Sequence, residues 1–443
     1  MDLTTAGILC ILLLLVLMGT SLNIGLAFIL SGFVTSTLLL GPKGVLSLLG
    51  QSAYFSVASP TWACIPLFIL MGSFAARGGY AARAYNGVYA LASGLKGSLA
   101  IATSFGCAVF GAISGSSIAT TAIFGKMALP EMNRLGYDKS FSTGCIASAG
   151  TFASMIPPSF MMVIYALFTQ QSVGKLFAAG VVPGILTAVA YAFLIVYRVR
   201  RNPALAPDRP RAAGVHDRTE RWRHVWGMWP VIVIAFTVMG GLYAGFFTPT
   251  EAAAAGAVIT LLFGWAQGTL RRLETVVAAM KESANTTAML FLINVGALFY
   301  SRVLAITRVP TELSMLLDRL DVPPFVILLG VIVLMFLLGM IMVPIGIYAL
   351  TLPIVFPILV SLGYDPIWFG VIALKMTDIG AITPPVGLNV YAMKGVIPKE
   401  DNISLEDIFR GIWPFCACEI VVLFVLVMFP SLSTWLPELL LGN

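Results

Sequence analysis

Long apolar runs recur from one end of this sequence to the other, and they constrain its fold more than any other feature. Of the 443 residues, 59% are hydrophobic and only 10% are charged, whereas a soluble domain usually carries about 25% charged residues. At roughly 20 residues for each crossing, the chain has room for about ten membrane spans with their loops. A backbone inside a bilayer must satisfy its own hydrogen bonds, which runs of this length can do only as helices. The sequence therefore predicts an all-α polytopic membrane protein.

Basic residues gather in one long polar stretch, residues 198–226. Eight arginines lie between Arg198 and Arg223, and a surplus of basic residues is typical of cytoplasmic loops. We interpret the stretch as a cytoplasmic loop rather than a partner-binding segment, and we expect no nucleic-acid partner. The two histidines of the chain, His216 and His224, both lie in it. A haem, a histidine metal site or a histidine proton relay in the membrane is therefore not expected.

A short internal repeat divides the chain into two similar units. The tetrapeptide Leu-Gly-Tyr-Asp occurs at 135–138 and again at 362–365. A Pro-Pro pair follows each copy at the same spacing, at 157–158 and at 384–385. Matching anchors without a gap indicate a duplicated unit rather than a chance similarity.

The basic residues also predict the orientation of the two units. They place five crossings between the two tetrapeptides, an odd number, so the repeats are expected to be inverted, as in many secondary transporters. Arg302, Arg308 and Arg319 fall on the outer side of this map and count against it. We read the first segment as a retained membrane helix. The expected organisation is N-terminal scaffold helices over 1–59, a first repeat over 60–197, the cytoplasmic loop over 198–226, scaffold helices over 227–286, a second repeat over 287–430 and a C-terminal tail over 431–443.

Each repeat holds a segment that fits a re-entrant helical hairpin, at about 98–134 and about 324–361. The apolar arms of the first are about 15 residues long, or about 22 Å as helix, which is short for ~30 Å of hydrocarbon. Its tip would hold Ser114 to Ser117, and the second tip lies near Pro344. An ordinary pair of spanning helices with small residues for close packing remains the alternative.

The Pro-Pro pairs interrupt two apolar helices, predicted over about 140–168 and about 366–394. Proline removes a backbone donor and frees a carbonyl one turn earlier, and in lipid such a carbonyl needs a partner. A bound cation is one partner and a neighbouring hydroxyl is the other. Carbonyl and hydroxyl oxygens suit sodium better than a transition metal. We expect one sodium site at Ser114, Ser117, Ala153, Ile156 and Ser159, and a second at Gly339, Gly380, Thr383 and Val386.

Half-helix N-termini at the same breaks would direct positive dipole ends toward an anionic substrate. Ser116 and Asn389 are expected to add hydrogen bonds to it. Lys375 and Asp378 lie beside the second break, where an ionisable group is costly and indicates function. Both are candidate substrate residues, although residues three positions apart on a helix can instead pair with each other, which we favour. Glu419 and Lys126, single charges in apolar runs, are expected to face a partner or the bundle interior.

A family resemblance rests on four motifs. They read Gly-Ala-Ile-Ser-Gly-Ser-Ser (111–117), Gly-Tyr-Asp-Lys (136–139), Ile-Pro-Pro-Ser (156–159) and Asp-Ile-Gly-Ala-Ile-Thr-Pro-Pro-Val-Gly-Leu-Asn-Val-Tyr (378–391). With them, nearly the whole chain resembles the large membrane subunit, the DctM component, of tripartite ATP-independent periplasmic (TRAP) transporters. Val343 departs from the pattern, because many members of the family carry an acidic residue there.

The resemblance implies a function and partners for the chain. Members take up organic acids such as C4-dicarboxylates, driven by a sodium gradient, across the bacterial inner membrane. The transport domain is expected to move like an elevator, in a fold similar to divalent anion–sodium symporters. The implied partners are a small four-helix membrane subunit, a periplasmic substrate-binding protein, the organic acid and membrane lipids, with sodium as the co-transported ion and no organic cofactor.

Other classes of protein fit the sequence less well. A channel would need a continuous polar lining or charged rings, whereas this chain has broken helices and few charges. An intramembrane enzyme would need a catalytic set at membrane depth, and the apolar runs contain no histidine. ATP coupling within the chain is disfavoured because it has no P-loop sequence. The closest alternative is a self-sufficient sodium–carboxylate symporter, because only the resemblance calls for a binding protein.

Overall fold

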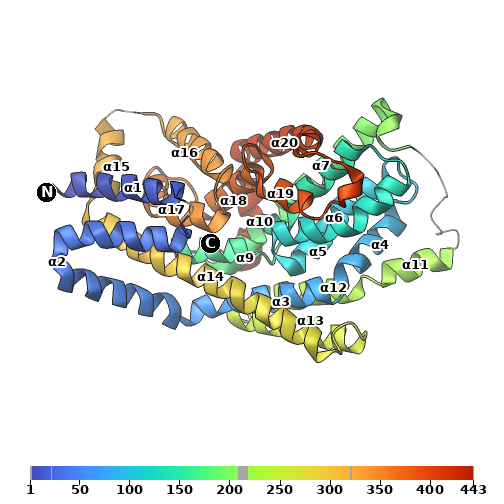
Figure 1. Cartoon of the computed structure of the whole chain (residues 1–443), viewed down its shortest axis with the longest axis horizontal. Helices are drawn as coiled ribbons and strands as arrows, with labels where there is room; N and C mark the ends of the chain where they lie inside the picture. The colour runs from blue at the N-terminus through green and yellow to red at the C-terminus, as the bar shows by residue number, and fades with distance from the viewer. Residues whose placement is uncertain (1, 21, 208–217, 320–321, 443) are drawn as a thin grey trace.

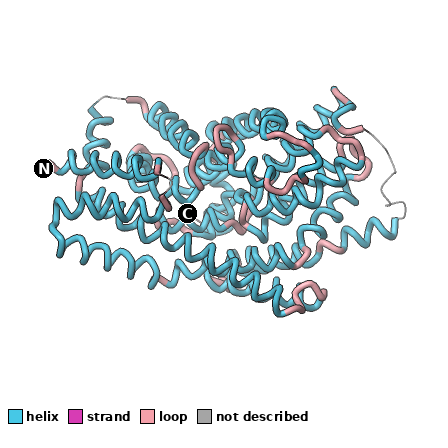
Figure 2. Tube along the Cα trace, in the orientation of Figure 1, coloured by secondary structure: helices cyan, strands magenta, loops and turns pink. Residues whose placement is uncertain are grey.

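The computed structural model describes residues 2–20, 22–207, 218–319 and 322–442, and throughout these residues the regular elements are helices (Figure 2). Seven of the described helices are long and apolar enough to cross a membrane, and two bent pairs raise the candidates to nine. The predicted all-α polytopic fold is confirmed.

Two sets of helices in the same order make up the two halves of the chain (Figure 1). Those of the first half are α1 (Leu3–Gly19), α2 (Ile24–Ala58), η1 (Pro60–Ala63), α3 (Cys64–Arg77), α4 (Tyr80–Ala92), α5 (Ser98–Ser114), α6 (Ser117–Arg134), α7 (Lys139–Ala149), α8 (Phe152–Met155), α9 (Phe160–Thr169) and α10 (Val173–Arg201). Between the halves lie η2 (Pro203–Leu205) and α11 (Arg218–Trp226). Those of the second half are α12 (Trp229–Tyr243), α13 (Pro249–Ala266), α14 (Leu273–Ile306), α15 (Val309–Arg319), α16 (Pro324–Gly339), α17 (Pro344–Ser361), α18 (Pro366–Ile382), α19 (Leu388–Lys394), η3 (Lys399–Asp401), α20 (Leu405–Met428) and α21 (Ser431–Leu441).

The internal repeat extends beyond the units predicted from the sequence. Helices α6 and α17 begin 227 residues apart, at Ser117 and Pro344, and α7 and α18 keep the same offset. Helix α2 bends at Gly41, which has a φ of 71°, and the turn between α13 and α14 holds Gly268, 227 residues later, with a φ of 86°. Helices α1 and α2 therefore correspond to α12, α13 and the first part of α14. The scaffold segments belong to the same duplication as the hairpins.

The repeated Leu-Gly-Tyr-Asp joins a hairpin to a broken helix in each half. In the second copy Gly363 has a φ of 85°, a left-handed conformation that glycine adopts without strain. The Tyr364 amide donates to the Leu359 carbonyl at 3.1 Å, which closes the end of α17 as a Schellman motif. The Asp365 side chain then accepts from the Trp368 amide at 2.6 Å and caps α18. The first copy makes the same bonds 227 residues earlier, so the tetrapeptide specifies a tight helix–helix corner.

The order of the spans agrees with inverted repeats. Between the two hairpins lie five candidate spans, an odd number that brings the second hairpin to the opposite side of a membrane if each crosses once. They are Lys139–Met155 with Phe160–Thr169, Val173–Arg201, Thr219–Tyr243, Pro249–Ala266 and Leu273–Ile306.

The two halves pack through equivalent pairs of helices. Helix α2 lies along α14, and α13 lies along α3 (Figure 1). Helix α20 packs on α7, while α10 packs on α18. The segment 431–443, expected as a tail, instead forms α21, which packs along α10 because its sequence is largely apolar.

The predicted cytoplasmic loop, 198–226, is helical at both ends. Helix α10 enters it and α11 leaves it, with the short η2 between them. Residues 208–217, which hold Arg209, Arg211 and His216, lie outside the described residues. The loop is therefore shorter than its polar composition suggests.

Because Asp365 caps α18 with its side-chain oxygen, Asp365→Ala should lower the free energy of unfolding by about 1 kcal/mol. Asp365→Asn keeps an equally good capping oxygen and should leave stability nearly unchanged. Thermal unfolding of the purified protein in detergent measures both variants. Equal destabilisation by the two would show that the negative charge of Asp365, not its cap, is what matters.

Candidate functional site

The tip of hairpin 1 (helices α5 and α6) lies against break 1 (residues 156–159), the interruption before α9. A Cβ on Gly111 would lie 2.6 Å from the Ala153 Cα, so α5 and α8 meet there through their backbones. The chain turns at Gly115, whose φ is 62°. A Cβ on Gly115 would lie 3.3 Å from the Phe160 amide nitrogen, directly after break 1. The first predicted sodium site therefore lies where the hairpin tip and the helix break meet.

Hydroxyl groups surround this junction. Ser114 Oγ lies 2.8 Å from Thr120 Oγ1, and Ser117 Oγ donates to Asn389 Oδ1 at 2.9 Å. The Ser159 hydroxyl is fully buried and has no hydrogen-bond partner among the described residues. A buried polar group without a partner is costly, so its oxygen is available to a bound ion.

Two further oxygens lie at the same place, and sequence reasoning missed them. Thr121 Oγ1 is buried and also without a partner among the described residues. A Cβ on Gly150 would lie 1.9 Å from Thr121 Oγ1 and 3.1 Å from the Ser117 carbonyl oxygen. The available signal was the run of serine and threonine residues just after the hairpin tip, at 116–121.

Hairpin 2 (helices α16 and α17) meets break 2 (residues 383–387) in the same way. A Cβ on Gly380 would lie 2.4 Å from the Gly339 carbonyl carbon, so these two backbones are in direct contact. The Val386 amide donates to the Met340 carbonyl at 3.3 Å. The Thr383 hydroxyl donates to a carbonyl one turn earlier in α18, at 2.6 Å, and keeps its lone pairs. All four residues of the second predicted sodium site therefore lie at one junction.

Asn389, predicted as a substrate residue, connects the two repeats. It lies on α19, directly after break 2, and is fully buried. Its Oδ1 accepts from Ser117 on hairpin 1, and its Nδ2 donates to the Ala147 carbonyl on α7 at 3.2 Å. Asn389 thus holds hairpin 1 and the first broken helix together from the second half of the chain.

A cavity of about 310 Å³ opens beside the tip of hairpin 1. Its lining includes Ser114 and Ser116 from the tip, and Glu282 and Thr286 from α14. Ser116 also caps α6, because its side chain accepts from the Ala119 amide. The cavity lies between the hairpin and the helices α3 and α14, so it separates two groups of elements that could move relative to each other.

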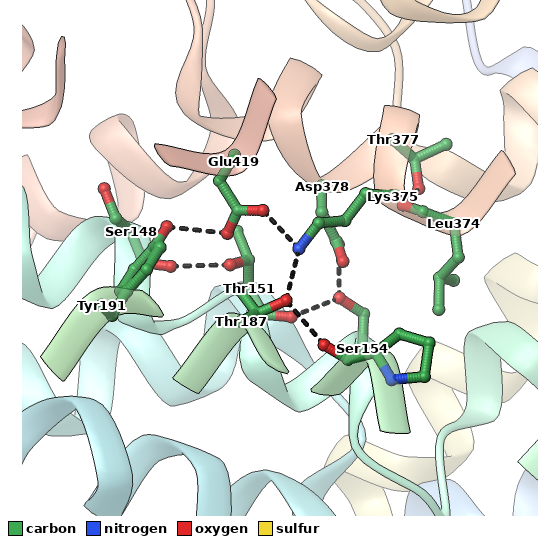
Figure 3. Close-up of polar contacts among 11 residues, drawn as sticks. Ser148, Thr151, Ser154, Thr187, Tyr191, Leu374, Lys375, Thr377, Asp378 and Glu419 are labelled. Carbon is green, nitrogen blue, oxygen red and sulfur yellow. Dashed lines mark hydrogen bonds and ion pairs between the residues drawn. The ribbon is translucent and has the colours of Figure 1, made fainter. Parts of the chain in front are cut away.

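Lys375 is buried in a network that joins three helices (Figure 3). Its Nζ forms an ion pair with Glu419 on α20 and donates to Thr187 Oγ1 on α10 at 2.9 Å. Glu419 also accepts from the Tyr191 hydroxyl at 2.7 Å. Glu419 therefore faces the bundle interior, one of the two positions expected for it, whereas Lys126 on α6 is exposed.

Asp378 contacts Ser154 on α8, just before break 1 (Figure 3). The favoured pairing of Lys375 with Asp378 is wrong, because each has a partner on another helix. Helix α18 is buried along its whole length between α10, α20, α16 and α8, so its side chains reach neighbours on every side. Both residues are engaged within the protein and neither lines the cavity beside hairpin 1.

Known proteins similar to this chain are transporters. Residues 9–432 match the family described as the tripartite ATP-independent periplasmic transporter, DctM component. The C4-dicarboxylate TRAP transporter large permease protein DctM of Pseudomonas aeruginosa is 36% identical over 411 residues, covering 92% of this chain and 93% of the relative. The ectoine/5-hydroxyectoine TRAP transporter large permease protein UehC of Ruegeria pomeroyi is 31% identical over 437 residues, covering 98% and 99%.

A solved structure shares the fold. The crystal structure of the Alcanivorax borkumensis YdaH transporter superposes with a TM-score of 0.62 at 14% sequence identity, covering 90% of this chain and 91% of that one. At this identity the likeness concerns the fold alone.

The contact between Gly339 and Gly380 gives a sharp test of the second junction. Gly380→Ala should lower stability by about 1–3 kcal/mol, because its methyl group would meet main-chain atoms that cannot move aside. Gly330→Ala, on the same hairpin with nothing within 4 Å, should be neutral or slightly stabilising. Unfolding midpoints of the two purified variants decide the point, and equal midpoints would contradict close packing of hairpin 2 on α18.

Proposed function

The chain belongs to the DctM-component family of tripartite ATP-independent periplasmic transporters, and we propose that it is the large subunit of a sodium-coupled carrier that imports an organic acid. It is a multi-pass protein of the bacterial inner membrane, and its relatives are transport permeases rather than enzymes. The family description, tripartite and periplasmic, implies two further components. We assign these to a small four-helix membrane subunit and a periplasmic substrate-binding protein.

The observation that carries the sodium proposal is the meeting of a hairpin tip with a helix break in both halves. A helix break leaves carbonyl groups without intrahelical partners, and at break 1 buried hydroxyls without partners lie beside them. Hard monovalent cations favour such oxygen ligands. The proposed first site draws on Ser114, Ser117, Ala153, Ile156 and Ser159 together with Thr121, and the proposed second site on Gly339, Gly380, Thr383 and Val386.

The proposed substrate site is the cavity beside hairpin 1. Helix α6 begins there, and a helix N-terminus favours a negative charge. Ser116 lines the cavity, and Glu282 on its other wall accepts from Arg77 Nη2 at 2.8 Å, which brings a cation to its rim. A carboxylate fits this surrounding, and relatives are named for C4-dicarboxylates and for ectoine. Asn389, Lys375 and Asp378 are satisfied within the protein, so we assign them to positioning rather than substrate contact.

We propose that the hairpins and broken helices move together against the remaining helices, as in an elevator. The cavity lies between hairpin 1 on one side and α3 and α14 on the other, so movement there would carry the substrate site past a fixed wall. The duplication gives the molecule two similar halves, and such halves can support one conformation open to each side.

Reconstitution tests the function directly. The chain is placed in liposomes with its small subunit, and uptake of candidate organic acids delivered by the binding protein is followed with an inward sodium gradient. Uptake should stop when potassium replaces sodium, and it should require the binding protein. Sodium-independent uptake would remove the cation proposal, and uptake without the binding protein would identify a self-sufficient symporter instead.

Ser159→Ala isolates the first sodium site. Its hydroxyl has no partner among the described residues, so a purely structural role predicts unchanged or higher stability on removal. A sodium ligand predicts a half-saturating sodium concentration raised about tenfold, which corresponds to about 1.4 kcal/mol. Ser433→Ala, which removes another fully buried hydroxyl without a described partner, on α21, is the matched control and should not change the sodium response.

Ser116 tests the substrate site separately. Ser116→Asp and Ser116→Asn both keep a side-chain oxygen that caps α6, but only aspartate adds a negative charge to the cavity. Uptake of an anionic substrate by the aspartate variant should show a KM raised at least tenfold over that of the asparagine variant, with equal thermal stability. Equal KM values for the two would place the substrate elsewhere.

A further inference from the structure

Three charged side chains are buried together in the part of the chain that the structure describes. Lys375, Asp378 and Glu419 have exposed fractions of 2%, 3% and 0%. Lys375 and Glu419 form an ion pair and neutralise each other. The carboxyl group of Asp378 is left over. As a carboxylate it would give the cluster a net charge of −1, and an uncompensated buried charge is strongly unfavourable.

The hydrogen bonds around Asp378 lack one proton if its carboxyl group is ionised. Ser154 Oγ lies 2.7 Å from the Thr151 carbonyl oxygen and also contacts Asp378 Oδ1 (Figure 3). A hydroxyl has one proton to donate, and a carbonyl can only accept. The Ser154 proton therefore serves the Thr151 carbonyl. The contact with Asp378 then needs a proton from the carboxyl group itself.

Neighbouring groups do not supply this proton. The Thr151 hydroxyl donates to the Ser148 carbonyl at 2.7 Å, and Lys375 donates to Glu419 and Thr187. A protonated Asp378 completes the chain, because it donates to Ser154, which donates to Thr151. Every polar group of the chain then has a partner, as buried networks require.

The titratable groups on the helices packed against α18 do not favour a charged Asp378. Helices α8 and α16 carry no titratable side chain. The other helices present neutral phenols and thiols, a second carboxylate at Glu419 that disfavours a charge on Asp378, and on α18 itself the paired Lys375. Those phenols and thiols are Tyr348 on α17, Tyr165 on α9, Tyr191 on α10, and Cys416 and Cys418 on α20; Tyr391 and Lys394 lie on α19, and Glu438 lies exposed on α21.

We propose that Asp378 is a proton-binding site between the two repeats, and that it is neutral in this conformation. The site differs from both proposed sodium sites and does not depend on the identity of the substrate. Ser154 stands next to break 1 and Asp378 one turn before break 2, so protonation favours the packing of one broken helix on the other. Raising the pH removes the proton, leaves a buried charge and loosens this packing.

Infrared spectroscopy of the purified full chain in lipid nanodiscs tests the site without partners or substrate. At neutral pH the wild-type protein should show the C=O stretching band of a protonated carboxylic acid. Asp378→Asn should abolish it. Asp365→Asn, which replaces the aspartate that caps the same helix, should leave it in place. Absence of an Asp378-dependent band at neutral pH would overturn the proposal.

Two further measurements keep the test decisive if Asp378→Asn folds poorly. Ser154→Ala removes the acceptor of the Asp378 proton, so the band should persist but move to higher frequency; an unmoved band would contradict the hydrogen-bond assignment. Repeating the spectrum with sodium and with choline separates a proton from a metal ion. Loss of the band on adding sodium would show that sodium, not a proton, neutralises Asp378. A sodium-independent band supports the proton site whether or not the transport function is as proposed.

Discussion

The rest of this structure depends on one constraint, which is that a helix interrupted inside a bilayer must find partners for its open backbone groups within the protein. Both interruptions meet the tip of a helical hairpin at van der Waals distance. Contact this close requires residues without bulky side chains, which Gly111 and Ala153 provide at the first junction and Gly339 and Gly380 at the second. Substitution at these glycines would separate the hairpins from the breaks.

The duplication explains why the two junctions resemble each other and also where they differ. With an offset of 227 residues, Ser148 and Thr151 of the first half correspond to Lys375 and Asp378 of the second. Hydroxyls on one side thus face charges on the other, and these side chains meet in a single network (Figure 3). The molecule is symmetric in its backbone and asymmetric in its buried charge.

Local signals in the sequence located much of this architecture. The predicted hairpins, about 98–134 and about 324–361, coincide with α5–α6 and α16–α17, because glycine, proline and capping aspartate act within a few residues of where they stand. The partner of Lys375 was not predictable, because Glu419 lies on another helix and only tertiary packing brings them together. The correspondence of α1–α2 with α12–α14 was equally hidden, since the two segments share backbone geometry but few letters.

The position of Asn389 has a consequence for how the proposed ion sites communicate. Its side chain leaves the helix that follows break 2 and bonds to Ser117 at the tip of hairpin 1. An ion that orders Ser117 at the first site would therefore also order the start of α19 at the second. Two sites that share an ordered element bind cooperatively, and the coupling is reciprocal. The carrier would then load its ions as a set rather than one at a time, which suppresses partially loaded forms that could cross the membrane and leak the gradient.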